Sequence, residues 1–190
     1  MTIMPSGRLV SRENDVAPTY ADIAHNLCRQ IRFGGSSKIT YTVMQHTFVV
    51  AAFVPPHMRA FALLHDACEA VTGDIPRPVK HPEQAMIEAD FTERISKAFG
   101  LPYPWPADVT EAVHRADLEA ACAEALTLFG EQARGWCQPW LEPSGAMLRD
   151  TQSMLPMAGI WIGNPEPAVE MFRKHLVVAL REWQEAVQHG

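Results

Sequence analysis

Two apolar segments that carry ionisable residues in their middle constrain this chain more than any other feature. Residues 43–54 read VMQHTFVVAAFV and residues 59–71 read RAFALLHDACEAV. Both are apolar on most faces of a helix, which predicts central positions in the fold. Yet His46 lies in the first segment and His65-Asp66 in the second. A buried carboxylate costs roughly several kcal/mol unless it is paired or binds a cation, so these residues need partners.

Helical periodicity with short glycine or proline breaks accounts for most of the chain. Helices are expected over residues 20–32, 42–54, 57–71, 82–99, 107–129 and 165–188. Residues 130–163 are less regular and are expected to form a partly helical insertion, anchored by Trp136, Trp140 and Trp161. Strand-like alternation is missing from the sequence. The predicted fold is therefore an all-α bundle of about six main helices, forming a single domain over residues 1–190.

Composition narrows the classes of function. A chain of 190 residues with 47% hydrophobic and 20% charged residues is typical of one globular domain. The net charge of −6 argues against a broad nucleic-acid-binding surface, but it leaves room for a local cationic pocket. The apolar runs are too short to span a membrane, and the N-terminus has no signal-peptide pattern. No nucleic-acid or membrane partner is expected.

The four cysteines, Cys28, Cys68, Cys122 and Cys137, are widely scattered and form no CxxC pair. Most of them lie in apolar helical patterns, which predicts buried, reduced thiols. Reduced thiols are the usual state in the cytoplasm, so a cytoplasmic location is expected.

The ionisable residues have the spacing of a metal site. Glu69 follows His65 by four positions and Asp66 by three, so a helix projects these side chains to one side. Asp117 lies on a later, alanine-rich helix that can approach closely. Two imidazoles and two carboxylates suit Mn, Fe, Co, Ni or Zn better than Ca. In the alternative, His46 is a hydrogen-bonded core residue and His65-Asp66 a local pair.

The ordered set formed by QH at His46, HD at His65-Asp66 and RAD at Asp117 resembles the HD-domain phosphohydrolase superfamily, an all-helical, metal-dependent group. The runs DIAHNLCRQIRFGG, YTVMQHTFVVA and HDACEAVTGDIPRPVK resemble one branch of it. That branch comprises bacterial 5′-deoxynucleotidases and phage-type deoxynucleotide phosphohydrolases, including dATP triphosphohydrolases. The matches span about residues 6–120. The resemblance implies an HD-domain helical bundle.

The resemblance also implies roles for single residues. One divalent ion would be held by His46, His65, Asp66 and Asp117. Glu69 matches the catalytic acid, which positions or activates water and assists the leaving group. Asp74 matches a loop carboxylate that supports the attacking water. Independently of the resemblance, burial and crowding by Asp66 predict a raised pKa for Glu69.

Three further positions are expected to contact the substrate. Arg32 matches the arginine that grips the 5′-phosphate, and Lys80 is a second candidate phosphate contact. Phe33 occupies the position of a tryptophan that packs near the sugar in the bacterial deoxynucleotidases. Because this residue differs, strict selection for the 2′-deoxy sugar is not expected.

The function implied by the resemblance is hydrolysis at the 5′-phosphate of small nucleotides, with a metal-activated water attacking phosphorus. A 5′-deoxynucleotidase acting on deoxynucleoside monophosphates is expected first. The alternatives are a dNTP triphosphohydrolase, where additional Mg would accompany the triphosphate, and a weaker one, hydrolysis of a guanosine tetraphosphate alarmone. A non-catalytic nucleotide or metal sensor is a further alternative, against which the presence of Glu69 and Asp74 argues. A homo-oligomer is expected from the resemblance alone.

Overall fold

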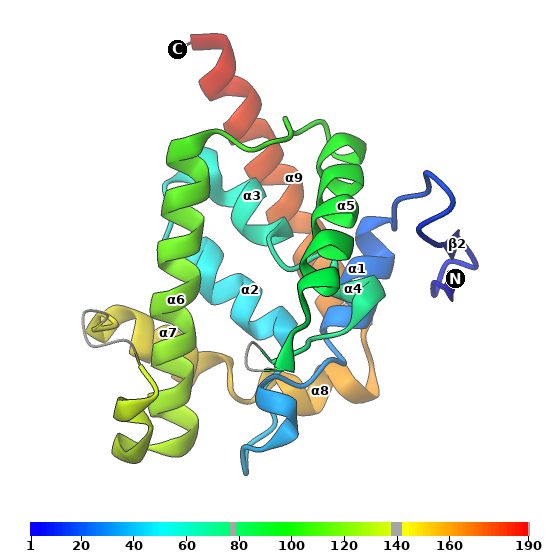
Figure 1. The fold of residues 1–190 in the computed structure, drawn as a ribbon. Helices are drawn as coiled ribbons and strands as arrows, with labels where there is room; N and C mark the ends of the chain where they lie inside the picture. The colour runs from blue at the N-terminus through cyan, green and yellow to red at the C-terminus, as the bar shows by residue number, and fades with distance from the viewer. Residues whose placement is uncertain (77–78, 138–141, 190) are drawn as a thin grey trace.

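The structure is a computed structural model that describes residues 1–76, 79–137 and 142–189, and it is an all-α bundle (Figure 1). The predicted fold class is confirmed. Its helices are α1 Tyr20–Leu27, α2 Val43–Ala52, α3 Arg59–Leu64, α4 Glu69–Thr72, α5 Pro82–Ala98, α6 Ala107–Phe129, α7 Gly145–Met154, α8 Met157–Gly163 and α9 Glu166–His189. Short 3-10 turns form η1 Phe33–Gly35, η2 Pro56–Met58 and η4 Glu131–Gly135. A two-residue antiparallel ladder pairs β1 Thr2–Ile3 with β2 Leu9–Val10.

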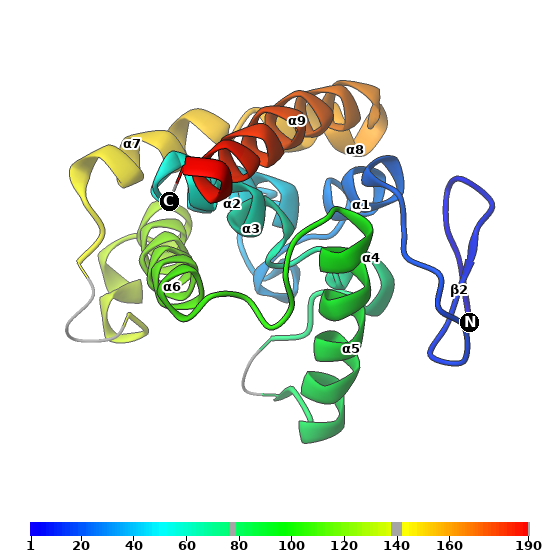
Figure 2. The same cartoon turned by 90° about the horizontal axis from the view of Figure 1, so that it is seen from above.

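Helix α2 lies at the centre of the bundle, as its apolar sequence predicts. Every residue from Val43 to Ala51 is buried. Helix α9 packs against α1 and α3 on one side, while α6 packs against α2 and α3 on the other (Figure 2). Helix α5 also contacts α3. The ionisable residue of α2 is thus held inside the protein, where it needs partners from neighbouring helices.

Capping boxes set the starts of α1 and α2. The Thr19 and Thr42 hydroxyls accept the amides of Asp22 and Gln45, whose side chains accept the Thr19 and Thr42 amides in return. Helix α1 ends at Leu27, earlier than predicted, and Arg32 lies beyond it in extended backbone (φ −68°, ψ 165°). The backbone there turns to pair with the start of α2, because the Arg32 amide donates to the Tyr41 carbonyl at 2.9 Å.

The helix predicted over residues 57–71 is interrupted where its charged residues lie, so the prediction of one continuous helix is wrong. Helix α3 ends at Leu64 and α4 begins at Glu69. Nδ1–H of His65 donates to the Ala62 carbonyl at 2.7 Å. In a continuous helix that carbonyl accepts the Asp66 amide. The side chain of His65 therefore takes the place of a backbone hydrogen bond, and the chain forms tighter turns between the two helices.

The insertion predicted over residues 130–163 is partly helical and contains η4, α7 and α8. Trp161 is 2% exposed and packs in the core, as an anchor should. Trp136 is 58% exposed, so it is not a packing anchor. Trp140 lies outside the described residues.

Two of the four cysteines are joined, which corrects the prediction of reduced thiols throughout. Cys122 of α6 and Cys137 form a disulfide with their Cα atoms 5.2 Å apart. Cys28 and Cys68 are free and buried, as predicted. The segment after α6 turns back along that helix through Gly130 and η4. The spacing of the cysteines in the sequence does not predict this turn, so it does not predict the disulfide. The cytoplasmic location was predicted from four reduced thiols, and only two of the cysteines are free.

Helix α9 covers the core with a narrower apolar stripe than its sequence suggests. Phe172 and Leu176 are buried, and Leu180 and Trp183 pack against the core in partly buried positions. Val187 is 61% exposed, because the last turns of α9 extend past the bundle (Figure 1). None of the helices in the described ranges combines the length and the apolar character needed to cross a membrane.

Candidate functional site

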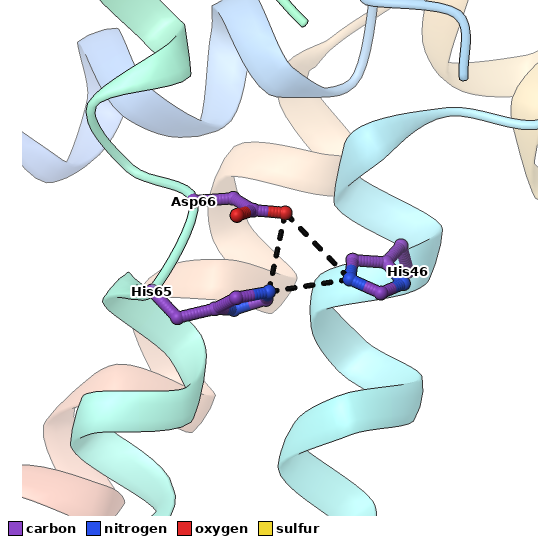
Figure 3. A group of neighbouring side chains, drawn as sticks. All are labelled: His46, His65 and Asp66. Atoms are coloured by element: carbon purple, nitrogen blue, oxygen red, sulfur yellow. Dashed lines mark hydrogen bonds and ion pairs between the residues drawn. The ribbon is translucent and has the colours of Figure 1, made fainter. Parts of the chain in front are cut away.

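The other three predicted ligands converge on the imidazole of His46. His46 comes from α2, His65 and Asp66 from the turn between α3 and α4, and Asp117 from α6. Figure 3 shows His46, His65 and Asp66, whose ligand atoms all lie within 4.8 Å of one another. The two Nε2 atoms are 3.2 Å apart, and His65 Nε2 is 3.1 Å from Asp66 Oδ2. Asp117 Oδ1 approaches His46 Nε2 to 3.1 Å.

Hydrogen bonds on the far side of each imidazole fix which nitrogen faces the cluster. His65 donates through Nδ1–H to the Ala62 carbonyl at 2.7 Å. His46 donates through Nδ1–H to Glu124 Oε1 at 2.6 Å. Each ring therefore presents Nε2 to the cluster, which is the arrangement that outer hydrogen bonds give to metal-binding histidines.

Glu124 is a site residue that the sequence analysis missed. It is fully buried on α6 and binds both His46 and Arg32, the latter through Nε to Oε2 at 2.9 Å. The available signal is its position seven residues after Asp117, which places both on the same face of a helix after two turns. Its alanine-rich surroundings also predict burial.

Electrostatics show that the cluster requires positive charge. Burial and Arg32 lower the pKa of His46, but Glu124 and Asp117 outweigh them and raise it to about 10. Burial raises the pKa of Asp66, but His65 and His46 outweigh it and hold the pKa at about 2. A proton on His46 and a divalent cation are competing ways of supplying this positive charge. The donor set thus fits a cation bound by two nitrogens and two carboxylates.

Arg32 lies directly beside the cluster, where the sequence analysis places the phosphate. Its Nη1 is 3.8 Å from Asp66 Oδ2, while Nε is held by Glu124. Burial lowers the pKa of the guanidinium, but Glu124, Asp66 and Asp117 outweigh this effect and raise it. Arg32 is therefore a permanent cation that is fixed in direction by a buried carboxylate.

Glu69 begins α4 and is 7% exposed. Burial first, then repulsion from Asp66 and Asp74, raises its pKa to about 9, so the predicted rise is confirmed. Its Oε2 is buried without a hydrogen-bond partner among the described residues. Burial likewise raises the pKa of Asp74. The environment therefore disfavours the charged form of both carboxyl groups, relative to water.

The backbone of α4 is held from the end of α1 by two amide side chains. Gln30 donates to the Glu69 carbonyl at 2.7 Å, and Asn26 donates to the Ala70 carbonyl at 2.8 Å. These bonds fix the place of Glu69 relative to Arg32, because Gln30 is two residues from Arg32 in the chain.

The remaining predicted substrate contacts have other partners in this structure. Lys80 Nζ forms an ion pair with Glu88 Oε2 at 2.6 Å, which balances the charge proposed for a second phosphate contact. The ring of Phe33 lies 5.6 Å from Cζ of Arg32, next to the candidate phosphate position. Phe33 therefore lies beside Arg32 at the site, whereas Lys80 is paired with a residue of α5.

Comparisons with known proteins identify relatives of this chain. No family model matches it. A protein of Escherichia coli strain K12, described as the uncharacterized protein YfdR, is 32% identical over 139 residues, which cover 72% of this chain and 74% of YfdR. An uncharacterized protein of Rhodobacter capsulatus is 34% identical over 121 residues, covering 57% of this chain and 62% of that protein. The chain therefore belongs to the same family as YfdR.

Proposed function

We propose that this protein is a metal-dependent phosphohydrolase that acts on the 5′-phosphate of small nucleotides, foremost deoxynucleoside monophosphates. The observation that carries the proposal is the convergence of two imidazoles and two carboxylates beside a fixed arginine. The ligand atoms are those of His46, His65, Asp66 and Asp117. Arg32 Nη1 lies 3.8 Å from one of these carboxylates. A cation site next to a guanidinium is the arrangement that a phosphate dianion requires.

The four ligands would hold one divalent transition-metal ion, chosen from Mn, Co, Zn, Ni and Fe. Such an ion, when bound, polarises phosphoryl oxygens and lowers the pKa of water. Arg32 would donate paired N–H groups to the phosphate, and Glu124 keeps the guanidinium from turning away. Both functions need charges whose positions are set before the substrate arrives.

Glu69 would carry the proton that the reaction moves. A carboxyl group with a pKa of about 9 holds its proton at neutral pH, and added positive charge nearby lowers that value toward neutrality. Such a group can donate a proton to a leaving oxygen. Asp74, which lies five residues further on, would support the attacking water.

Monophosphates are proposed ahead of triphosphates because of Lys80. Its charge is engaged by Glu88, so among the residues that the structure describes Arg32 is the cation that lies against the ligand cluster. A dNTP triphosphohydrolase, with additional Mg on the substrate, remains the alternative outcome. The proposed enzyme is a homo-oligomer, as the resemblance implies. The cytoplasmic location stays a prediction from the cysteines, of which Cys28 and Cys68 are free and buried.

A nucleotide panel tests the proposal. Purified protein is assayed on deoxynucleoside mono-, di- and triphosphates with Mn, Co, Ni, Zn or Mg, or with EDTA, while phosphate, pyrophosphate and triphosphate products are separated. We expect metal-dependent release of phosphate from monophosphates. Asp66→Asn should lose activity by about 100-fold or more, because a metal ligand is weakened. Asp150→Asn, on the exposed face of α7, is the matched control.

Glu69→Gln separates the proton transfer from metal binding in the same assay. The amide keeps the size of the side chain but has no acidic proton, so turnover should fall by about 100-fold or more while the metal remains bound. Full activity of Asp66→Asn in EDTA would disprove the metal mechanism. Tight nucleotide binding without cleavage by any metal would favour a sensor.

A further inference from the structure

Three aromatic rings form a cluster beside Arg32. Phe33 contacts Phe129 edge to face at 5.4 Å between ring centroids, and it contacts Trp136 in the same manner at 5.7 Å. The Phe33 ring is also 5.6 Å from Cζ of Arg32. The cluster thus continues outward from the candidate phosphate position.

Packing in this structure does not account for Trp136. Its side chain is 58% exposed, although Phe33 beside it is partly buried. An indole is the largest apolar side chain, and exposed indoles are enriched where proteins bind ligands. The exposed ring next to a cationic site is the feature that needs an explanation.

The backbone of Phe33 gives an independent indication. Its φ of 56° lies in the left-handed region, which bulky residues rarely adopt. Such a conformation costs roughly 1–3 kcal/mol and is found where the surroundings hold a side chain in a required place. In this conformation the ring of Phe33 contacts both the guanidinium of Arg32 and the indole of Trp136.

Trp136 is tied to the helix that carries part of the candidate metal site. It precedes Cys137, whose disulfide partner Cys122 lies on α6 between Asp117 and Glu124. Phe129, at the end of α6, supports the Phe33 ring from the other side. The disulfide and the contact with Phe33 therefore connect the segment of Trp136 to α6 and to the residue that follows Arg32.

We propose that Trp136, supported by Phe33, forms a stacking surface for the base of a nucleotide whose phosphate is bound by Arg32. The proposal rests on the proposed function for the position of the phosphate. Stacking on an aromatic ring tolerates every base, because each base has a π-face. The ligand class is therefore a nucleoside phosphate with little discrimination among bases.

The test compares dAMP with 2-deoxyribose 5-phosphate, which has the same sugar and phosphate but no base. KM and kcat are measured for wild type, Trp136→Ala and Trp136→Phe. We expect Trp136→Ala to raise KM for dAMP about tenfold or more, with little change for deoxyribose phosphate. Trp136→Phe should restore most of the affinity. Tyr20→Ala, which removes an exposed aromatic ring on α1, is the control.

Calorimetric binding of dAMP to the full chain in EDTA provides a second readout without turnover. Cleavage of dAMP with an unchanged KM in Trp136→Ala overturns the stacking surface and leaves the phosphohydrolase intact. If the protein cleaves no nucleotide but binds dAMP more weakly after Trp136→Ala, the stacking surface is supported and the phosphohydrolase is overturned. An equal rise of KM for both compounds also overturns the proposal, as does a protein that neither binds nor cleaves dAMP.

Discussion

Glu124 shows how much a single buried carboxylate can control. One oxygen accepts a hydrogen bond from His46 and the other accepts from Arg32, so one residue orients a candidate metal ligand and a candidate phosphate contact. The carboxylate is 0% exposed and its cost of burial is offset by these two cationic or polar partners. The candidate metal ligand and the candidate phosphate contact are therefore coupled through one side chain.

Glu124→Gln is expected to weaken metal binding by about 10- to 100-fold, because the outer partner of His46 loses its charge. Competition with a chelating dye measures the change. Glu131→Gln removes an exposed carboxylate that also pairs with an arginine, Arg134, and should leave metal affinity unchanged. Equal metal affinity in both variants would contradict a positioning role for Glu124.

Among the elements, α1 secures the N-terminal segment through Asp22. Its carboxylate accepts hydrogen bonds from the amide and hydroxyl of both Ser6 and Thr19, at 2.7–2.9 Å. The β1–β2 ladder packs beside α1 at the edge of the bundle (Figure 2), and this carboxylate connects the turn of the ladder to the helix. Burial raises the pKa of Asp22, but these four donors outweigh it and lower the pKa below 3.8.

Asp22→Asn is expected to destabilise the protein by about 1–3 kcal/mol at pH 7, because an amide cannot accept the same four bonds. A carboxyl with a lowered folded-state pKa stabilises the fold above its unfolded pKa, near 3.8, and loses that contribution as the pH falls through the folded value. Urea unfolding at pH 7 and below pH 4 should show the two proteins converging at low pH.

Asp108→Asn, an exposed change in the first turn of α6, is the control for this comparison. A pH-independent difference between wild type and Asp22→Asn would show that the charge of Asp22 is not what stabilises the segment.

The α3–α4 break separates what local sequence predicts from what it does not. The apolar character of residues 60–64 predicts burial, and this is confirmed. The break depends on the His65 ring, which donates to the Ala62 carbonyl in place of the Asp66 amide. The periodicity of apolar residues does not predict which of these two donors binds. The apolar faces and capping residues therefore predict most helices, while side-chain competition with the backbone decides where they end.

At the scale of the whole molecule, long-range pairs limit sequence prediction. His46, His65, Asp66 and Asp117 were identified because charged residues stand out in apolar segments, and the structure brings them together. The Cys122–Cys137 disulfide and the exposure of Trp136 depend on how the segment after α6 turns back. No local pattern encodes that turn, so these features required the three-dimensional structure.

The disulfide is expected to stabilise the whole fold. Cys137→Ser should lower the free energy of unfolding by about 2–4 kcal/mol, because a loop with a sequence separation of 15 gains freedom in the unfolded chain. Calorimetry with and without reductant measures this effect. Reductant should bring the wild-type Tm down to that of Cys137→Ser and should not change the variant. If the disulfide is shown to be fully reduced and the wild-type Tm still does not change, the expectation is contradicted.

Helix α6 carries Asp117, Cys122 and Glu124 on one uninterrupted rod. A helix turns by about 100° per residue, so one inserted residue between Asp117 and Glu124 would swing their side chains onto different faces. Such an insertion would separate the candidate ligand Asp117 from Glu124, the carboxylate that holds His46 and Arg32. We therefore expect this short stretch of α6 to tolerate no change in length.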